Sequence, residues 1–321
     1  MSLCEVRMPA YKRPELLKRA IKSLLEQTYK NWIVIVMDDS PMQECRAVVE
    51  CYNDSRIMYS PNKTQLGPAR NLDQAFQSAG YVGGSYAFVL EDDNYLFPCF
   101  IAANITSIRD NGVAIVLRNQ DMRFDKDGES MPYNKTTMGD WYCHKVYEPA
   151  ELFPYLFFHS GISNGGLFWD TAKITSDLQI GTEVASQAHQ EKFRCLQLTD
   201  RICFEPEPLC VFTLFKARDD AVEPSKRAKR LYNRTEQSLI MYLLKRFGPK
   251  IVKRSTEIAD QMGCRYQLER QLIDGFYLLY DFKRVRGLRF LYFLSKSLLR
   301  YLLYGDPLGD YYKKIRHKTR D

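Results

Sequence analysis

The sequence predicts an α/β protein with a mostly parallel sheet and helices on both faces, followed by a helical C-terminal extension. Continuous apolar runs at 32–37, 86–90 and 113–117 each stop at polar residues, as strands buried on both faces do. Segments with helical periodicity separate these runs, and a strand–helix alternation is typical of a parallel sheet covered by helices. With 321 residues, of which 45% are hydrophobic, the chain can bury a large core.

The individual elements follow from local patterns. A helix is expected at 15–27, where leucines recur on one face and Pro14 occupies the first turn. The other expected elements are, in chain order, a strand at 4–8, a strand at 32–37, a helix at 42–52, a strand at 56–59, a helix at 68–79, a strand at 86–90, a helix at 97–109, a strand at 113–117, a hairpin and loops across 118–160, a strand at 165–169, a helix at 183–198, and strands at 201–204 and 209–214. From about 217 the chain reads as helical, so we place an α/β domain at 1–216 and a helical region at 217–321.

The formal net charge of +7 is concentrated at the C-terminal end. Residues 283–321 contain 11 Lys and Arg but 3 Asp and Glu, whereas the rest of the chain is nearly neutral. Such a tail favours an anionic surface, although a solvated charged end is the simpler interpretation. No basic sheet motif with interleaved aromatic residues is present, so nucleic acid is not expected as a partner.

Cysteine usage points to a reducing compartment. Nine cysteines and four histidines occur without a C-x-x-C pair, which predicts reduced thiols and argues against a structural zinc site. No signal peptide precedes the first expected strand, and no run of about 18 uncharged apolar residues occurs. We therefore expect a cytoplasmic protein without a transmembrane helix.

Three adjacent carboxylates, Glu91, Asp92 and Asp93, follow the apolar run 86–90. Adjacent carboxylates repel one another unless a cation neutralises them. Hard divalent cations such as Mn²⁺ and Mg²⁺ take carboxylate oxygens and leave positions open for phosphate. The triplet therefore predicts a metal site beyond the carboxyl end of a strand, with an acidic surface turn as the alternative.

Two weaker signals accompany the triplet. Asp38 and Asp39 end another apolar run, and a carboxylate there could accept a hydrogen bond from a base or a ribose, although a turn is the simpler interpretation. Arg70 begins an expected helix, where its guanidinium could meet a diphosphate. The alternative interpretation is that Arg70 is a solvated helix residue.

Together these motifs resemble the family 2 glycosyltransferases, which have the GT-A fold. The matching segments are MPAYKRP at 8–14, LLEQTY at 24–29, VMDDS at 36–40, GPARN at 67–71 and VLEDDN at 89–94. The resemblance covers roughly residues 4–215. It implies a nucleotide-sugar donor and inversion by a single displacement.

The resemblance also implies a role for each matching residue. Tyr11 would stack on the base, Asp39 would contact uracil, and Arg70 would face the diphosphate. Asp93 would hold the metal, and Asp92 would approach the ribose or the donor sugar. We further assign Pro9 and Arg13 to the nucleotide site, Glu91 to the metal, and Asn164, Gly165 and Gly166 to the donor sugar.

Members of the family carry an acidic general base at the start of a helix, which maps to Glu191 here. Many members have Glu-Asp at this point, whereas this chain has Gln190-Glu191. Glu183 and His189 are therefore rival candidates for the base.

The expected function is transfer of a sugar from a UDP-sugar to a hydroxyl of a glycan or lipid-linked glycan. A non-catalytic nucleotide-sugar binding protein and a sugar nucleotidylyltransferase are the alternatives. The segment 288–304 reads as an amphipathic helix. It predicts peripheral contact of 283–321 with the cytoplasmic face of a membrane, with packing on its own protein or on a second subunit of a homodimer as the alternative. Its apolar stripe consists of Leu288, Leu291, Leu298, Leu299 and Leu302.

Overall fold

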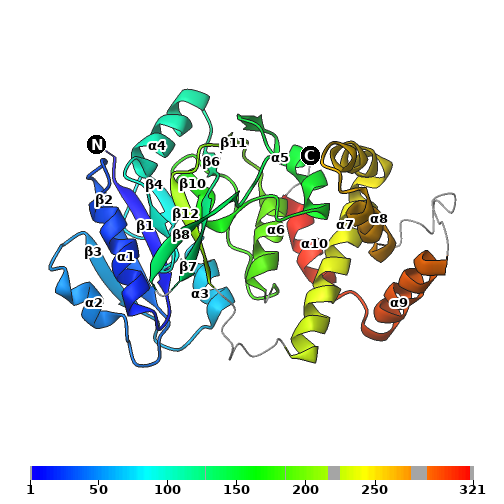
Figure 1. Cartoon of the computed structure of the whole chain (residues 1–321), viewed down its shortest axis with the longest axis horizontal. Coiled ribbons are helices and arrows are strands. Elements are labelled where there is room, and N and C mark those ends of the chain that lie inside the picture. The colour runs from blue at the N-terminus through cyan, green and yellow to red at the C-terminus, as the bar shows by residue number, and fades with distance from the viewer. Residues whose placement is uncertain (1, 127, 185, 216–224, 276–287, 319–321) are drawn as a thin grey trace. The chain divides into compact units, whose positions relative to one another are not determined.

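The computed structural model describes residues 2–126, 128–184, 186–215, 225–275 and 288–318 (Figure 1). The chain forms two compact units, and each unit is assembled from several segments. The first unit comprises Met1–Pro149, Ile162–Arg194 and Leu198–Ala221, and the second comprises Ala150–Gly161, Cys195–Gln197 and Val222–Asp321.

The first unit is built on an eight-stranded sheet in the order β3-β2-β1-β4-β10-β6-β11-β9. The strands are β1 (Cys4–Ala10), β2 (Trp32–Asp38), β3 (Ile57–Pro61), β4 (Tyr86–Val89), β6 (Ile115–Arg118), β9 (Lys145–Tyr147), β10 (Leu167–Asp170) and β11 (Ile202–Glu205). Strands β1 to β4 pair in parallel, and β11 pairs in parallel with β6. Strand β10 runs antiparallel between β4 and β6, and β9 is an antiparallel edge strand. The prediction of a mostly parallel sheet is confirmed.

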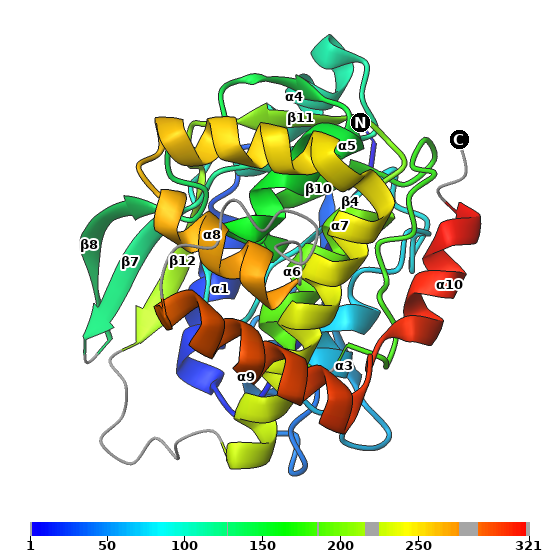
Figure 2. The ribbon, with the colours of Figure 1, turned by 90° about the vertical axis from the view of Figure 1, so that its right-hand side faces the viewer.

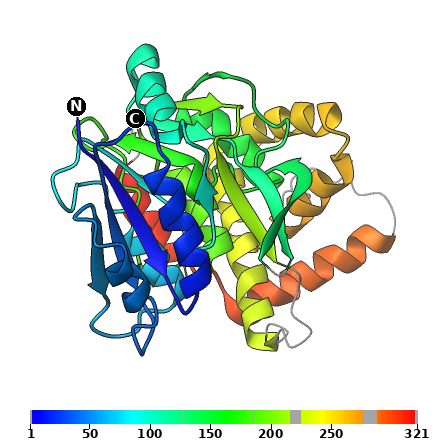
Figure 3. The same ribbon diagram turned by 60° about the vertical axis from the view of Figure 1, so that its left-hand side comes forward.

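Helices cover both faces of this sheet. They are α1 (Pro14–Leu25), α2 (Arg46–Cys51), α3 (Pro68–Gln74), α4 (Phe100–Asn111) and α6 (Gln187–Gln197). Helices α1 and α4 share one buried apolar cluster with alternate residues of the strands, such as Val6 and Phe88. Figure 3 shows α1, in blue, lying along the sheet. On the opposite face Phe76, just after α3, stacks on Trp169 of β10 with ring centroids 6.0 Å apart.

A buried ion pair explains why α3 ends earlier than the periodicity predicts. Arg7 of β1 donates to the backbone oxygen of Ala75 at 3.1 Å, which a helix continued to residue 79 would use, and to that of Ala79 at 2.7 Å. Glu5 pairs with Arg7 at 3.2 Å and accepts hydrogen bonds from backbone N–H groups of 81, 82 and 84. The pair therefore fixes the loop that leads into β4.

A second, four-stranded sheet has the order β5-β12-β7-β8. Its strands are β5 (Tyr95–Leu96), β7 (Asp121–Lys126), β8 (Glu129–Thr136) and β12 (Cys210–Phe215). Strands β7 and β8 form the hairpin expected within 118–160. Because β5 directly follows the acidic triplet, this sheet anchors the chain just beyond β4.

The second unit is helical (Figure 2). It contains most of α5 (Pro149–Leu152), a 3₁₀ helix at Phe153–Phe157, α7 (Lys226–Gln261), α8 (Arg265–Asp274), α9 (Leu288–Tyr304) and α10 (Gly309–Lys318). Helix α7 begins at the cap of Ser225, whose hydroxyl accepts from the Ala228 N–H at 3.1 Å, and it is kinked at Gly248. Helix α9 coincides with the predicted amphipathic segment. Among the described residues no helix combines the length and apolar character needed to cross a bilayer.

Candidate active site

The acidic triplet lies directly after β4, at the edge where the parallel strands end. Asp92 is fully buried and accepts hydrogen bonds from the Tyr11 backbone N–H at 3.0 Å and from Arg13 at 2.5 Å. The other guanidinium nitrogen of Arg13 pairs with Asp93. The segment after β1 and the segment after β4 are therefore joined through one arginine.

The carboxylates of the triplet are crowded electrostatically. Burial, together with the charges of Asp93, Glu191 and Asp92, raises the pKa of Glu91 to about 8. Burial also raises the pKa of Asp92 to about 7, although Arg13 opposes this shift. The single positive charge of Arg13 thus leaves the triplet with an excess of negative charge.

The residues of the triplet fit a hard divalent cation. Their carboxylate oxygens are the ligands that Mn²⁺ and Mg²⁺ prefer, and a cation would relieve the repulsion that adds to the effect of burial on both pKa values. Asp93 is partly exposed, and the Arg13 side chain beside it is 39% exposed. A cation can therefore reach Asp93 if the guanidinium swings away.

Asp39 shapes the neighbouring loop. Its carboxylate accepts from the backbone N–H groups of Leu66 at 2.7 Å and Gly67 at 2.8 Å, and from the side chain of Asn62 at 2.8 Å. Gly67 has a φ of 82°, a conformation that favours glycine. The same loop reaches Tyr11, because Gln65 donates to the Tyr11 hydroxyl at 3.3 Å. Asp39 and Tyr11 are therefore brought to one loop.

Arg70 lies in the first turn of α3 and is exposed. Within the described part of the chain it forms no ion pair or hydrogen bond with another side chain. Its guanidinium is therefore available to an anion, and the expected contact of Arg70 with a diphosphate stays a prediction.

Of the three candidates for the general base, Glu191 lies with the acidic triplet. Its carboxylate accepts from the Asn164 backbone N–H at 2.8 Å, and its charge contributes to the raised pKa of Glu91. His189 is completely buried within the protein. Glu183 is exposed and precedes the first residue of α6.

A buried arginine that the sequence analysis did not single out supports Glu191 and Asn164. Arg194 donates to Asn164 Oδ1, to Asp73 at 3.2 Å and to the Leu178 carbonyl at 2.7 Å. Its guanidinium also lies 3.6 Å from the centre of the Phe76 ring. Asp73 in turn accepts from the backbone N–H groups of 180 and 181. No sequence pattern distinguishes Arg194 from an exposed helix arginine.

Gly165 and Gly166 sit against the end of β6, in a 3₁₀ turn, Asn164–Gly166, that precedes β10. A Cβ atom on Gly166 would lie 2.3 Å from the Arg118 carbonyl oxygen, and one on Gly165 would lie 2.5 Å from Gln120 Nε2. Backbone packing therefore requires Gly166, and the predicted contact of these residues with a sugar stays a prediction.

Comparison with known proteins defines the class. The profile described as Glycosyl transferase family 2 matches residues 5–166, and the chain belongs to this family. The fold also matches that of S. aureus TarS 1–349 in complex with UDP-GlcNAc, with a TM-score of 0.56, 16% identity, and coverage of 99% of this chain and 91% of that chain. The predicted GT-A fold is confirmed.

Two curated relatives share part of the chain. The Escherichia coli protein named UDP-Glc:alpha-D-GlcNAc-diphosphoundecaprenol beta-1,3-glucosyltransferase WfgD is 27% identical over 120 residues, which are 37% of this chain and 46% of that protein. The Campylobacter jejuni GalNAc(5)-diNAcBac-PP-undecaprenol beta-1,3-glucosyltransferase is 32% identical over 99 residues, which are 30% of this chain and 31% of that protein. The matched segments span less than half the length of these relatives.

Proposed function

We propose that the protein is an inverting, metal-dependent glycosyltransferase that moves a sugar from a UDP-sugar to a hydroxyl of a glycan or lipid-linked glycan. The observation that carries this proposal is the grouping of Glu191 with the acidic triplet at the end of the parallel strands. Family membership supports the reaction class. The names of the two curated relatives support a lipid-linked acceptor, and the TarS complex supports a UDP-sugar donor.

In this proposal Glu191 takes the proton of the acceptor hydroxyl as that oxygen attacks the anomeric carbon. The Asn164 N–H holds one oxygen of Glu191, and Arg194 fixes Asn164 from behind. The carboxylate of Glu191 is thereby oriented before the acceptor arrives, which lowers the entropy lost on reaching the reactive geometry.

Asp93 and Glu91 would hold Mn²⁺ or Mg²⁺. The bound cation would supply stabilisation of the charge that develops on the departing diphosphate. Tyr11 would stack on the base, Asp39 would contact uracil, and Arg70 would face the diphosphate. Pro9, Arg13 and Asp92 complete the proposed nucleotide site.

A thermal-shift panel of nucleoside diphosphates, each with and without Mn²⁺, tests this proposal. We expect UDP with Mn²⁺ to raise the melting temperature, and we expect Asp93→Ala to abolish the metal-dependent part. Asp54→Ala is the matched control, because Asp54 pairs with Arg56 away from the triplet. Stabilisation by GDP or dTDP but not by UDP would contradict the assignment of the base.

Product analysis distinguishes a glycosyltransferase from a non-catalytic nucleotide-sugar binding protein and from a sugar nucleotidylyltransferase. A glycosyltransferase hydrolyses its donor slowly with metal and releases UDP, whereas a binding protein leaves the donor intact. A nucleotidylyltransferase instead releases pyrophosphate from a nucleoside triphosphate and a sugar phosphate.

We also propose that α9 places the protein on the cytoplasmic face of a membrane. Its exposed face carries large apolar side chains, with Leu302 70% and Leu303 62% exposed. The other exposed members are Leu291, Tyr292, Leu298 and Leu299. Ser297 is turned inward, where its hydroxyl meets Asp274 and its carbonyl accepts from Gln237 at 3.1 Å. The strongly basic composition of 283–321 favours an anionic bilayer over a second copy of the chain.

Flotation with vesicles of phosphatidylglycerol and phosphatidylethanolamine tests the membrane proposal. We expect the full chain to float at low salt and the double variant Leu302→Ser with Leu303→Ser to remain at the bottom. Tyr266→Ser, at an exposed aromatic residue of α8, is the matched control. If the full chain does not float, and sedimentation shows that the parent is a dimer and the double variant a monomer, the apolar face is a subunit interface.

A further inference from the structure

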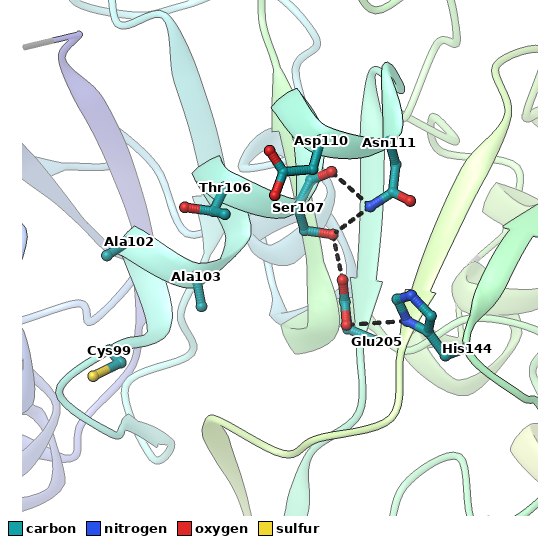
Figure 4. Close-up of a pocket in the computed structure, with 9 residues that line it drawn as sticks. All are labelled: Cys99, Ala102, Ala103, Thr106, Ser107, Asp110, Asn111, His144 and Glu205. Carbon is teal, nitrogen blue, oxygen red and sulfur yellow. Dashed lines mark hydrogen bonds and ion pairs between the residues drawn. The ribbon is translucent and has the colours of Figure 1, made fainter.

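A second group of metal-ligating side chains lies away from the acidic triplet, between α4 and the edge of the large sheet. His144 precedes the edge strand β9, whereas Cys203 and Glu205 lie two residues apart on β11 and face the same side. Figure 4 shows the side chains of His144 and Glu205 directed toward each other, with Ser107 of α4 beside Glu205. Among the described residues this is the one set of three such side chains whose ligand atoms all lie within 4.8 Å of one another.

The distances within this group suit a single ion. His144 Nδ1 lies 3.3 Å from Glu205 Oε2, and Cys203 Sγ lies 4.0 Å from Glu205 Oε1. The three ligand atoms lie within 4.8 Å of one another. Ligands of a tetrahedral zinc ion, at bond lengths of about 2.0–2.3 Å, are separated by roughly 3.3–3.8 Å. Small side-chain movements would therefore complete the geometry.

We propose that His144, Cys203 and Glu205 form a binding site for a soft divalent transition metal, with Zn²⁺ as the best match. A mixed nitrogen, sulfur and oxygen ligand set is typical of Zn²⁺, whereas Mn²⁺ and Mg²⁺ prefer the all-oxygen triplet. The two sites would thus select different ions. The cysteine spacing argues against a structural zinc site, but sheet pairing brings His144 beside β11 in a way that spacing cannot reveal.

The surroundings supply a fourth position and a route of entry. Ser107 Oγ bonds Glu205 Oε1 and lies 3.7 Å from Cys203 Sγ, and Asn111 donates to the Ser107 hydroxyl at 3.4 Å. A hollow of about 570 Å³ is lined by Ser107, His144 and Glu205 and gives solvent access to these three side chains. Ser107 or a water molecule could therefore occupy the fourth position.

Metal binding would replace contacts that now satisfy the ligands. Cys203 is completely buried, and its thiol must lose a proton to solvent before the sulfur can bind the ion. The side chain of His144 is 55% exposed and can turn its ring toward the ion. The bound ion would then tie the start of the edge strand β9 to β11 and stabilise this edge of the sheet.

Titration of the full chain with Zn²⁺ alone tests the proposal. We use the Asp93→Ala background so that the triplet does not contribute, and a competing chelator sets the free Zn²⁺. One equivalent should bind, and His144→Ala or Cys203→Ser should weaken binding at least tenfold, since loss of even a supporting residue costs about 10–100-fold. Cys143→Ser is the matched control, because Cys143 is an exposed cysteine beside His144 and outside the group.

Co²⁺ provides a second readout that does not depend on stability. Ligation by a thiolate gives a sulfur-to-cobalt charge-transfer band, which should appear in the parent and the Cys143→Ser protein and vanish in Cys203→Ser. His144 is exposed, so circular dichroism should show that His144→Ala keeps its fold. Equal Zn²⁺ affinity in His144→Ala and the parent, or Co²⁺ binding without the band, would overturn the proposal.

Discussion

Binding of Mn²⁺ to the acidic triplet should expel protons, and the number expelled should fall as the pH rises. In the metal-free protein the pKa of Glu91 is about 8 and that of Asp92 is about 7. A carboxyl group with a raised pKa holds a proton below that pKa. Glu91 must lose this proton to ligate the ion, and the positive charge of the ion beside Asp92 favours loss of the Asp92 proton as well. We therefore expect metal affinity to be lost as the pH falls through these values.

The two pKa values set the size of the effect. At pH 6 both groups are protonated, so binding should release close to two protons, and at pH 7 about one and a half. At pH 8 fewer than one should be released. The apparent affinity for Mn²⁺ should correspondingly rise by roughly 500-fold between pH 6 and pH 8.

Calorimetry in two buffers of different ionisation enthalpy measures the protons released. Glu91→Gln removes the group that titrates near pH 8, so proton release at pH 7 should fall by about one in this variant. If no protons are released at pH 6 and the affinity is the same at pH 6 and pH 8, the carboxylates are already ionised and the reasoning is wrong.

Three further predictions concern single residues. Glu191→Gln should lower turnover, measured as initial rates, by about 100-fold or more, while calorimetry should show nearly unchanged donor affinity. A fully active variant would move the role of the base to Glu183 or His189. Gly166→Ala should lower the free energy of unfolding in urea by about 1–3 kcal/mol because its Cβ meets the Arg118 carbonyl, whereas Gly309→Ala, whose Cβ meets nothing within 4 Å, should be nearly neutral. Glu5→Gln should cost about 3–5 kcal/mol in the same assay because it leaves Arg7 buried without a counter-charge, and an effect as small as that of the exposed Glu50→Gln would contradict this. Burial disfavours the charge of Glu5, but backbone N–H groups and Arg7 lower its pKa, so its contribution should be lost as the pH falls through that lowered pKa.

The sequence predicts the parallel half of the fold well because apolar runs and helical stripes report burial directly. Strand β2 and helix α9, for example, lie where the patterns place them. The antiparallel direction of β10 was not predictable, because an apolar run reads alike whichever way its neighbours point. Its pairing depends on contacts with β4 and β6, which are distant in sequence.

The candidate site likewise contains residues that the sequence predicts and residues that it does not. The acidic triplet could be found because three adjacent carboxylates after an apolar strand are conspicuous. The contacts of Arg194 with Asp73 and Asn164 could not be found from the sequence. A single charged residue in a helix is normally solvated, and its burial is a property of the tertiary structure. Arg13 was assigned to the nucleotide, and its pairing with Asp92 and Asp93 emerges only in three dimensions.

The segment 150–161 limits how the protein can be dissected. It lies between two parts of the sheet-bearing unit in sequence, yet its side chains belong to the helical unit. Phe153 packs against Phe247 with ring centroids 5.2 Å apart, and the Pro154 carbonyl accepts from Ser255 at 3.2 Å. A chain shortened at 216 would therefore strip these apolar residues of their partners and should aggregate. A chimera that exchanges the helices must carry this segment with them.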